Sequence, residues 1–371
     1  MQIGVPRETH FCETRAPIIP SDVGRLVKLG ATVVVESGIG ARLHLSDTDY
    51  EKAGAVVTSN RRELLSSSDI ILRLRKPDLS EVTLLKPGCL HVSYLDPFHE
   101  RALITALAEQ GVSAVAMEFI PRTTRAQKMD ALSSQASLAG YAAVILAAER
   151  TNRVFPMMTT PAGTINPARV FVIGAGVAGL QAIATAKRLG ARVDAFDTRP
   201  VVAEQVRSLG ARFVEVDLGE TGQTKEGYAQ ALTEEQLRIQ REAMARQCAI
   251  SDIVITTAQV FGKKAPIIIT REMIAGMRPG SIIVDLAIET GGNTEGAQLG
   301  QEVEINGVRI IALENMPGRV AAAASQMYSA NLYNFVDEFW DRENKRIALN
   351  LEDDILQACL VTHDGKVRRD F

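Results

Sequence analysis

The chain of 371 residues alternates short apolar, β-branched runs with longer stretches in which apolar residues recur at helical spacing. In the amino-terminal third, the helix-like stretches are residues 22–31, with "DVGRLVKLGA", and residues 97–111, which end in glycine. The strand-like runs around them are residues 2–6, 32–37, 68–74, 89–95 and 113–119. Strands and helices in this rhythm predict βαβ units and therefore a parallel sheet.

A second series of the same kind follows, with strand-like runs at residues 168–176, 192–197, 211–217, 251–258, 280–287 and 308–313. The helix-like residues 321–340 come after this series, and we expect them to return the chain to the first domain. The predicted fold is α/β, with two doubly wound, Rossmann-like domains that have parallel sheets and are separated by a cleft. We place the first domain at residues 1–133 plus 318–371 and the second domain at residues 134–317.

The composition is that of an ordinary soluble globular protein, with 46% hydrophobic and 23% charged residues. The formal net charge of −3 argues against a nucleic-acid-binding surface, which would need a basic patch. The longest apolar run, residues 142–148, is shorter than the roughly 20 residues of a membrane span. The four cysteines form no CxxC pair, and the five histidines show no metal-ligand spacing. We therefore expect a soluble, cytoplasmic protein without a bound metal.

The strongest local motif is "VFVIGAGVAGLQ", in which Gly174, Gly176 and Gly179 form GxGxxG between a strand and a helix that opens at Val177. Gly174 allows a sharp turn, Gly176 lets backbone N–H groups approach a pyrophosphate, and Gly179 allows close packing of helix and strand. The amino end of the helix then offers free N–H groups and a partial positive charge to phosphate. This context predicts a dinucleotide site, although a doubly wound domain that has lost its ligand would show the same pattern.

The next strand ends at Asp197, followed by Thr198 and Arg199. A carboxylate at this position can accept hydrogen bonds from the adenosine ribose of NAD, and it would repel the 2′-phosphate of NADP. Arg199 tempers that preference because its charge would attract the phosphate. We therefore expect NAD(H), bound with Asp197, Thr198 and Arg199 near the adenosine.

Residues 121–141 read "PRTTRAQKMDALSSQASLAGY" and combine a dense polar loop with a helix of small residues. The loop carries charged and amide side chains with almost no apolar residue between them, so it does not resemble a core helix. Two interpretations remain open from the residues alone: a salt-bridged surface loop, or a loop that holds a polar ligand.

These motifs together resemble a known family, the alpha subunits (soluble NAD(H)-binding domain I) of the proton-translocating NAD(P) transhydrogenases, which are relatives of alanine dehydrogenase. The resemblance covers nearly the whole chain and includes "GVPRET", "IPRTTRAQKMDALSSQASLAGY", "SDIVITTAQVFGKKAPIIIT" and "RPGSIIVDLAIETGGN". It implies that NADH on this chain passes hydride to NADP+ on a partner subunit. It also implies a homodimer, a membrane-embedded partner subunit that couples proton translocation, and a location at the inner membrane through these partners.

The resemblance assigns the polar loop to the nicotinamide, with Arg122, Gln127 and Asp130 as its catalytic residues and Ser133 directly behind them. Hydride moves between two rings only near van der Waals contact, so that positioning dominates the barrier. The Gln127 amide can hold the carboxamide or ribose of the dihydronicotinamide, and Arg122 and Asp130 can pair to fix the loop. Other residues implied near the nucleotide are Gly227 and Tyr228 on a mobile loop, Gln240, and Thr257, Ala258 and Gln259 beside the nicotinamide ribose.

Two other functions stay open. An amino-acid dehydrogenase of the alanine dehydrogenase type would need a carboxylate clamp, for which Arg15 and Arg75 are candidates, and an acid or base such as Glu289. The catalytic histidine of that family is replaced by Asp96, and strand alternation points His91 to the opposite face, which favours a surface or core role for His91. The third possibility is a regulatory module that senses NAD without catalysis.

Overall fold

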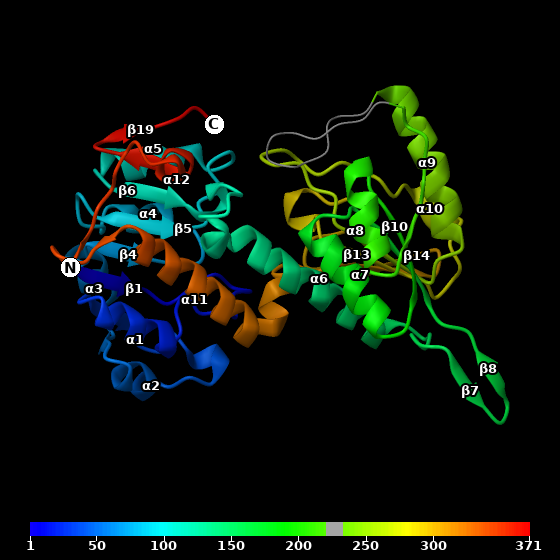
Figure 1. Cartoon of the computed structure of the whole chain (residues 1–371), viewed down its shortest axis with the longest axis horizontal. Coiled ribbons are helices and arrows are strands. Elements are labelled where there is room, and N and C mark those ends of the chain that lie inside the picture. Colours follow the sequence, from blue (N-terminus) through cyan, green and yellow to red (C-terminus); the bar gives the residue numbers. More distant parts are fainter. Residues whose placement is uncertain (220–232) are drawn as a thin grey trace. The chain divides into compact units, whose positions relative to one another are not determined.

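The computed structural model describes residues 1–219 and 233–371, and the chain divides into two compact units (Figure 1). The first unit comprises Met1–Gln135 and Gly318–Phe371, and the second comprises Ala136–Pro317. Each unit has its own parallel-dominated sheet with helices packed against it, which confirms the α/β class and the two Rossmann-like sheets expected from the sequence.

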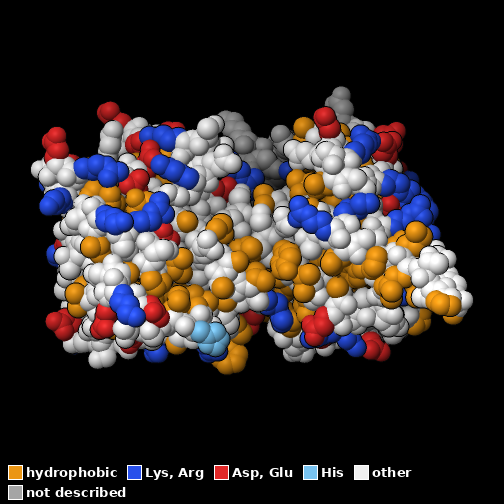
Figure 2. Space-filling view, turned by 60° about the horizontal axis from the view of Figure 1, so that its bottom comes forward, with side chains coloured by type: hydrophobic (Ala, Val, Ile, Leu, Met, Phe, Trp, Pro, Cys, Tyr) orange, Lys and Arg blue, Asp and Glu red, His pale blue; other side chains and the backbone are white. Residues whose placement is uncertain are grey.

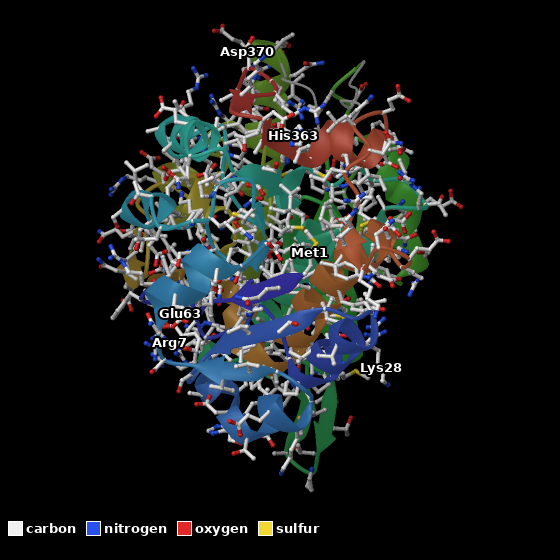
Figure 3. All side chains as sticks on the ribbon, turned by 90° about the vertical axis from the view of Figure 1, so that its left-hand side faces the viewer. Met1, Arg7, Lys28, Glu63, His363 and Asp370 are labelled. Carbon is white, nitrogen blue, oxygen red and sulfur yellow. The ribbon has the colours of Figure 1, made fainter. Side chains whose placement is uncertain are left out.

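The sheet of the first unit has the strand order β19-β18-β6-β5-β4-β1-β2-β3. Neighbouring strands from β3 through β6 are parallel, whereas β18 runs antiparallel to β6. Figure 3 shows this unit with its side chains, with Met1 directly before β1 and His363 at the end of β18. The strands are β1 Gln2–Val5, β2 Thr32–Glu36, β3 Val56–Thr58, β4 Ile70–Leu72, β5 Leu90–Ser93, β6 Ser113–Ala116, β18 Leu360–His363 and β19 Lys366–Val367.

The segment after residue 318 is an integral part of the first unit. Its long helix α11 (Ala321–Glu338) is hydrogen-bonded to the segment that connects β1 to helix α1. The hydroxyl oxygen of Ser325 accepts the backbone N–H of Ala16 (2.9 Å), and that of Ser329 accepts the backbone N–H of Ile19 (3.1 Å). The remaining elements of this unit are α1 Pro20–Lys28, α2 Asp47–Lys52, α3 Arg61–Ser67, α4 Leu79–Val82, α5 Arg101–Glu109, α12 Asp354–Cys359, β16 Trp340–Asp341 and β17 Arg346–Ile347.

The sheet of the second unit has the order β11-β10-β9-β12-β13-β15-β14, and only β14 runs antiparallel to its neighbour within the described residues. The chain passes from β9 to β10 and β11 on one side and then returns to β12 on the other side. Such a reversal opens a crevice at the carboxyl ends of β9 and β12, where open α/β sheets bind ligands. The strands are β9 Arg169–Ile173, β10 Arg192–Phe196, β11 Arg212–Phe213, β12 Ile253–Thr256, β13 Ile282–Asp285, β14 Gln301–Ile305 and β15 Val308–Ala312.

Both faces of this sheet are covered, as the run of apolar residues in β9 indicates. Val170 and Val172 belong to one buried cluster, and Phe171 and Ile173 to a second cluster on the opposite face. The helices of the second unit are α7 Val177–Arg188, α8 Ala203–Ser208, α9 Glu234–Ala249 and α10 Arg271–Ala275, together with most of α6.

Helix α6 (Ala131–Arg150) is long and apolar enough, with a mean hydropathy of 1.4, to pass the length and composition test for a membrane span. The expectation of no membrane span rests on the short uninterrupted apolar run, and it stays a prediction because core helices of soluble proteins have the same length and composition. Ala143, Val144 and Ala147 are buried in the core of the second unit. Packing in a protein core therefore accounts for much of the composition of this helix.

A β-hairpin that the sequence pattern does not predict joins α6 to the second sheet. Its strands are β7 Met158–Thr160 and β8 Gly163–Ile165. The side chains of Met157, Met158 and Ile165 on or beside it are exposed, and Figure 2 shows hydrophobic side chains at the surface of this unit.

Gly140 marks the place where α6 meets the start of α7. A Cβ at this position would lie 2.1 Å from the carbonyl oxygen of Ala178, a backbone atom that cannot rotate away. The two helices therefore pack with only hydrogen atoms between their backbones at this point.

We predict that Gly140→Ala lowers the free energy of unfolding by about 1–3 kcal/mol, because the methyl group forces α6 and α7 apart. Gly24→Ala in α1 is the matched control, since its Cβ would meet its nearest neighbour, the Ala53 carbonyl oxygen, at an ordinary 3.7 Å. Alanine should stabilise that helix by roughly 0.5–1 kcal/mol. Urea unfolding followed by circular dichroism measures both effects, and equal effects of the two substitutions would contradict the close helix contact.

Candidate functional site

The glycine-rich turn after β9 is shaped by main-chain contacts. Gly174 has a left-handed φ of +94°, and the Thr257 hydroxyl donates a hydrogen bond to its carbonyl oxygen (3.0 Å). A Cβ on Gly179 would lie 1.8 Å from the same carbonyl oxygen, so only glycine fits there. A Cβ on Gly176, in contrast, would meet nothing within 4 Å. Two glycines are therefore required by the fold of the turn, and the third leaves open space above it.

Helix α7 begins beneath this open space, at Val177. Its N-cap residue is Gly176, and no side chain of the described residues caps the helix. The N–H groups of its first turn are thus available to a ligand, and the helix dipole favours an anion at this end. The turn has the geometry that accepts a phosphate group.

Asp197 and Arg199 form an ion pair at the carboxyl end of β10. The Asp197 carboxylate accepts the backbone N–H of Ala175 (2.8 Å) in the glycine-rich turn. It also accepts the backbone N–H of Arg199 (2.8 Å), and the guanidinium binds it through Nε (2.9 Å) and Nη2 (2.8 Å). Sequence reasoning treats these two residues as separate influences on a nucleotide, whereas the structure brings them into direct contact.

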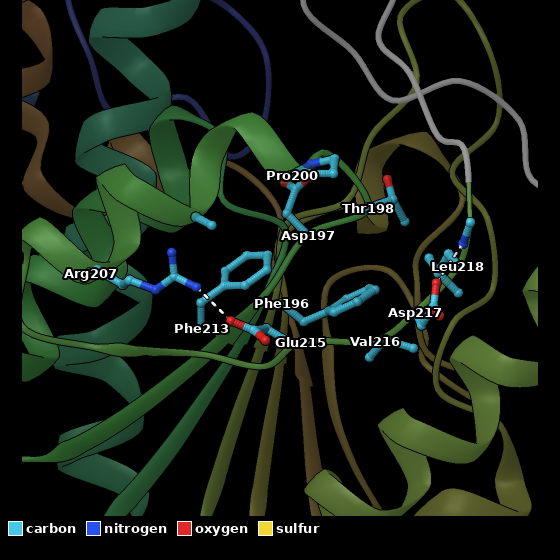
Figure 4. Close-up of a pocket in the computed structure, with 12 residues that line it drawn as sticks. Phe196, Asp197, Thr198, Pro200, Arg207, Phe213, Glu215, Val216, Asp217 and Leu218 are labelled. Carbon is cyan, nitrogen blue, oxygen red and sulfur yellow. Dashed lines mark hydrogen bonds and ion pairs between the residues drawn. The ribbon is translucent and has the colours of Figure 1, made fainter.

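A pocket of about 390 Å³ lies beside this ion pair (Figure 4). The rings of Phe196 and Phe213 give it apolar surfaces, and the ion pair between Arg207 and Glu215 (2.7 Å) gives it a polar side. Apolar walls with a few polar groups are typical of sites for flat heterocyclic ligands. The lining residues are Phe196, Asp197, Thr198, Pro200, Ala203, Arg207, Phe213, Glu215, Val216, Asp217, Leu218 and Gly219.

The loop after β12 lies on the other side of β9 from this pocket in the strand order. Thr257 and Ala258 are partly buried, and Gln259 is exposed with its amide donating to the Leu286 carbonyl (3.4 Å). Gln240 is buried on α9. Two further residues singled out from the sequence, Gly227 and Tyr228, lie outside the described residues.

The polar loop of the first unit follows β6 and contains a single turn of 3₁₀ helix, Gln127–Met129. Arg122 and Gln127 are exposed. Asp130 accepts both the N–H (2.9 Å) and the hydroxyl (2.6 Å) of Ser133, so this carboxylate caps the start of α6. The expected pairing of Asp130 with Arg122 stays a prediction, and the contacts described here join Asp130 to Ser133 at the start of α6.

The other charged residues of this loop bind the carboxyl-terminal segment. Arg125 contacts Asp353 (2.6 Å), and Lys128 contacts Glu338 (2.7 Å). The carbonyl oxygen of Lys128 accepts hydrogen bonds from the amides of Asn331 and Asn334 on α11, each at 3.0 Å. Sequence reasoning missed these two asparagines, although "SANLYNF" places both on one helix. The loop is therefore salt-bridged, and the side chains of Arg122 and Gln127 are exposed at its surface.

Arg15 and Arg75, the candidate carboxylate clamp, both bind Glu13. The distances are 2.7 Å from Arg15 Nε and 2.8 Å from Arg75 Nε to the carboxylate oxygens. Burial alone would raise the pKa of Glu13, but the hydrogen bonds and charges of the two arginines outweigh burial and lower it to about 2. An internal carboxylate thus already occupies both guanidinium groups.

The structure also shows the surroundings of the residues that were considered for acid–base chemistry. Asp96 follows β5 with a φ of +52°, and its carboxylate contacts His99 Nδ1 (2.7 Å). Glu289 accepts the backbone N–H of Asn315 (2.9 Å) in the second unit. His91 is fully buried in β5, where burial, aided by the charge of Arg73, lowers its pKa to about 3 and keeps it neutral. His91 is a core residue.

Comparison with known proteins matches both halves of the chain. The family models "Alanine dehydrogenase/PNT, N-terminal domain" and "Alanine dehydrogenase/PNT, C-terminal domain" match residues 4–139 and 143–370. An NAD(P) transhydrogenase alpha subunit of Rhodospirillum rubrum is 44% identical, over 99% of this chain and 97% of that protein. The crystal structure of a transhydrogenase from Sinorhizobium meliloti has a TM-score of 0.89 and 44% identity, over 99% of this chain and all of that one (100%).

The alanine dehydrogenase of Halomonas elongata is 31% identical, over 99% of this chain and 94% of that protein. The similarity thus extends along the full length of both kinds of relative, and it is greater for the two transhydrogenase proteins. The chain belongs to the alanine dehydrogenase/PNT family, within which it resembles the transhydrogenase alpha subunits more than it resembles this alanine dehydrogenase.

Proposed function

We propose that the chain is the NAD(H)-binding subunit of a proton-translocating NAD(P) transhydrogenase. NADH bound here passes hydride to NADP+ held on a partner subunit. The observation that carries this proposal is the uncapped amino end of α7 beneath the open Gly176 position, in a chain 44% identical to a transhydrogenase alpha subunit over nearly its full length.

The second unit supports a specific pose for NADH. The pyrophosphate lies over Gly176 and Val177, and the adenosine lies over the carboxyl end of β10, beside Asp197, Thr198 and the pocket. The nicotinamide half then runs toward the loop after β12, with Thr257, Ala258 and Gln259 near its ribose. Gln240, Gly227 and Tyr228 complete the proposed contacts on the basis of the family resemblance.

Nucleotide choice depends on the ion pair between Asp197 and Arg199. A ribose hydroxyl can donate to the carboxylate by sharing an oxygen with the arginine or by displacing it. A 2′-phosphate would face the same carboxylate, whose negative charge repels it. NADH is therefore favoured over NADPH on this chain, with NADP(H) expected on the partner.

The exposed side chains of the first unit's loop fit a positioning role. Gln127 offers an amide to the dihydronicotinamide, and Arg122 offers a positive charge, while Asp130 and Ser133 fix the backbone from which both project. Hydride transfer between two nicotinamides needs no proton donor, so these residues act by placing one ring against the other.

The proposed partners are a membrane-embedded subunit, an NADP(H)-binding subunit and a second copy of this chain. The name "NAD(P) transhydrogenase subunit alpha", which the relative in Haemophilus influenzae carries, supports an enzyme of several subunits. The exposed apolar residues at the β7–β8 hairpin support a protein contact in the second unit. The chain would lie in the cytoplasm, peripheral to the inner membrane through its partners.

An amino-acid dehydrogenase is the second candidate, favoured by the 31% identity to an alanine dehydrogenase and by the arginine pair Arg15 and Arg75. Glu13 engages both arginines. Asp96 stands where a neutral acid–base histidine would be needed, and His91 is buried in the core. These features favour the transhydrogenase.

We predict that the purified chain reduces NADP+ with NADH only when an NADP-binding partner subunit is added, because the second nucleotide has its site there. The chain alone should not oxidise alanine with NAD+, whatever the pH. Absorbance assays of both reactions in one preparation measure this. Alanine oxidation by the chain alone would establish the second candidate and contradict the first.

We predict that Gln127→Asn reduces the rate of hydride transfer far more than it reduces NADH affinity. The amide is kept but withdrawn by one methylene, and a misplacement of about 1 Å can cost on the order of a hundredfold in a reaction governed by proximity. Fluorescence titration gives the affinity, and stopped-flow single turnovers with the partner give the rate.

Gln357→Asn, at an exposed position on α12, is the matched control and should change neither quantity. If Gln127→Asn behaves like this control, the loop is a surface feature without a catalytic role. If the NADH affinity falls strongly while the rate of hydride transfer at saturating NADH stays normal, Gln127 contributes only to binding of the nucleotide.

A further inference from the structure

Asn293 lies in the loop after β13 and is fully buried, with every polar atom of its side chain hydrogen-bonded. Its Oδ1 accepts the N–H of Ala258 (3.0 Å). Its Nδ2 donates to the carbonyl oxygens of Ala258 (2.8 Å) and Pro266 (2.9 Å). One side chain thus binds both backbone groups of a single residue in the loop after β12 and also the far end of that loop.

The backbone of Asn293 is held independently of that loop. Its N–H donates to the carboxylate of Asp285 at the end of β13 (2.7 Å), which also accepts the N–H groups of Thr294 (2.8 Å) and Ala287 (2.9 Å). Asp285 is 1% exposed, so this carboxylate is a fixed internal anchor. Asn293 therefore links the end of β13 to the loop after β12 through hydrogen bonds.

The near end of the same loop is tied to the glycine-rich turn. The Thr257 hydroxyl donates to the Gly174 carbonyl oxygen (3.0 Å), and a Cβ on Gly174 would lie 2.6 Å from that hydroxyl. Thr257 and Asn293 thus fix Ala258 from both sides. Only an amide supplies one acceptor and two donors at this size, so no other residue of similar volume could replace Asn293 in all three bonds.

We propose that Asn293 is a positioning residue for the nicotinamide half of NADH, an inference that rests on the proposed function. In the strand order, β12 and β10 flank β9 on opposite sides. A dinucleotide that crosses this reversal puts its adenosine over β10 and its nicotinamide half toward β12. Displacement of the Thr257–Gln259 loop therefore weakens contacts with the nicotinamide half and leaves the adenosine contacts intact.

The test compares AMP with NADH, because AMP carries only the adenosine half. We expect Asn293→Ala to raise the Kd of NADH about tenfold, since three buried backbone groups lose their partner and the loop shifts. The Kd of AMP should stay within about twofold of the wild-type value. Asn293→Asp keeps the size of the side chain and its acceptor but loses both donors. It should therefore also raise the Kd of NADH more than the Kd of AMP. This variant replaces the alanine variant in the test if the alanine variant does not fold.

Gln247→Ala is the matched control, because Gln247 is another buried amide of the second unit and its Nε2 donates to Asp194 on β10 (2.6 Å). It should lower the thermal unfolding temperature and leave the ratio of the NADH and AMP affinities unchanged. A purely structural role for Asn293 would give the same unchanged ratio.

The outcomes separate the two proposals. If the wild-type chain binds no NADH, the proposed function fails. If the wild-type chain binds NADH but the Asn293 variants keep the wild-type ratio of affinities, or lose AMP and NADH binding equally, the positioning role of Asn293 is overturned.

Discussion

The close approach of the Gly174 carbonyl oxygen to Gly179 is the constraint on which the candidate site depends. The distance of 1.8 Å to a hypothetical Cβ leaves no room for any side chain, so the first turn of α7 is pressed against the strand end that precedes it. This packing directs the free N–H groups of the helix into the space over Gly176. Asp197 secures the turn from β10 and Thr257 secures it from β12. The turn thus offers backbone N–H groups to an anion by its geometry, without any basic side chain in the turn itself.

The polar loop of the first unit is anchored in a comparable way. Arg125, Lys128 and Asp130 are occupied with ion pairs or a helix cap, and α11 holds the backbone of the loop through Asn331 and Asn334. The exposed groups, Arg122 and Gln127, project from this anchored frame. A reaction that depends on the placement of two rings requires such a frame, because a side chain on a loose loop cannot hold a ring to within a fraction of an ångström.

Much of the fold could be predicted from the sequence because its strands are short apolar runs with helix-like stretches between them. The glycine motif could also be predicted, since strand, GxGxxG and helix are contiguous in the chain. The sequence pattern does not predict β3, β14, β16, β17, β18, β19 or the β7–β8 hairpin. No residue of β3, β7, β8, β14, β17 or β19 is buried, so these strands lack the buried apolar runs that mark most of the predicted strands. The apolar character of α6 over its whole length is not evident from its longest apolar run, because small polar residues interrupt that run.

The residues of the candidate site can be proposed from the sequence, and they stay a prediction, whereas their contacts cannot be foreseen. Pairing of Asp197 with Arg199, capping by Asp130 and the binding of Glu13 by two arginines each depend on side-chain direction, which a sequence pattern does not specify. The sequence does not indicate a structural role for Asn293 or Asn331, because each binds the backbone of a loop that is distant in the sequence. Buried amides at such positions become visible only when the backbone groups they bind are known.

The most direct measurement is the titration of Gly176→Ala with NADH, together with its unfolding midpoint. The Cβ at this position meets no protein atom within 4 Å, so the stability should remain within about 0.5 kcal/mol of wild type. The added methyl group would fill the space assigned to the pyrophosphate, and we expect NADH affinity to fall by about tenfold or more. An unchanged stability with an unchanged NADH affinity would contradict the placement of the dinucleotide over the glycine-rich turn.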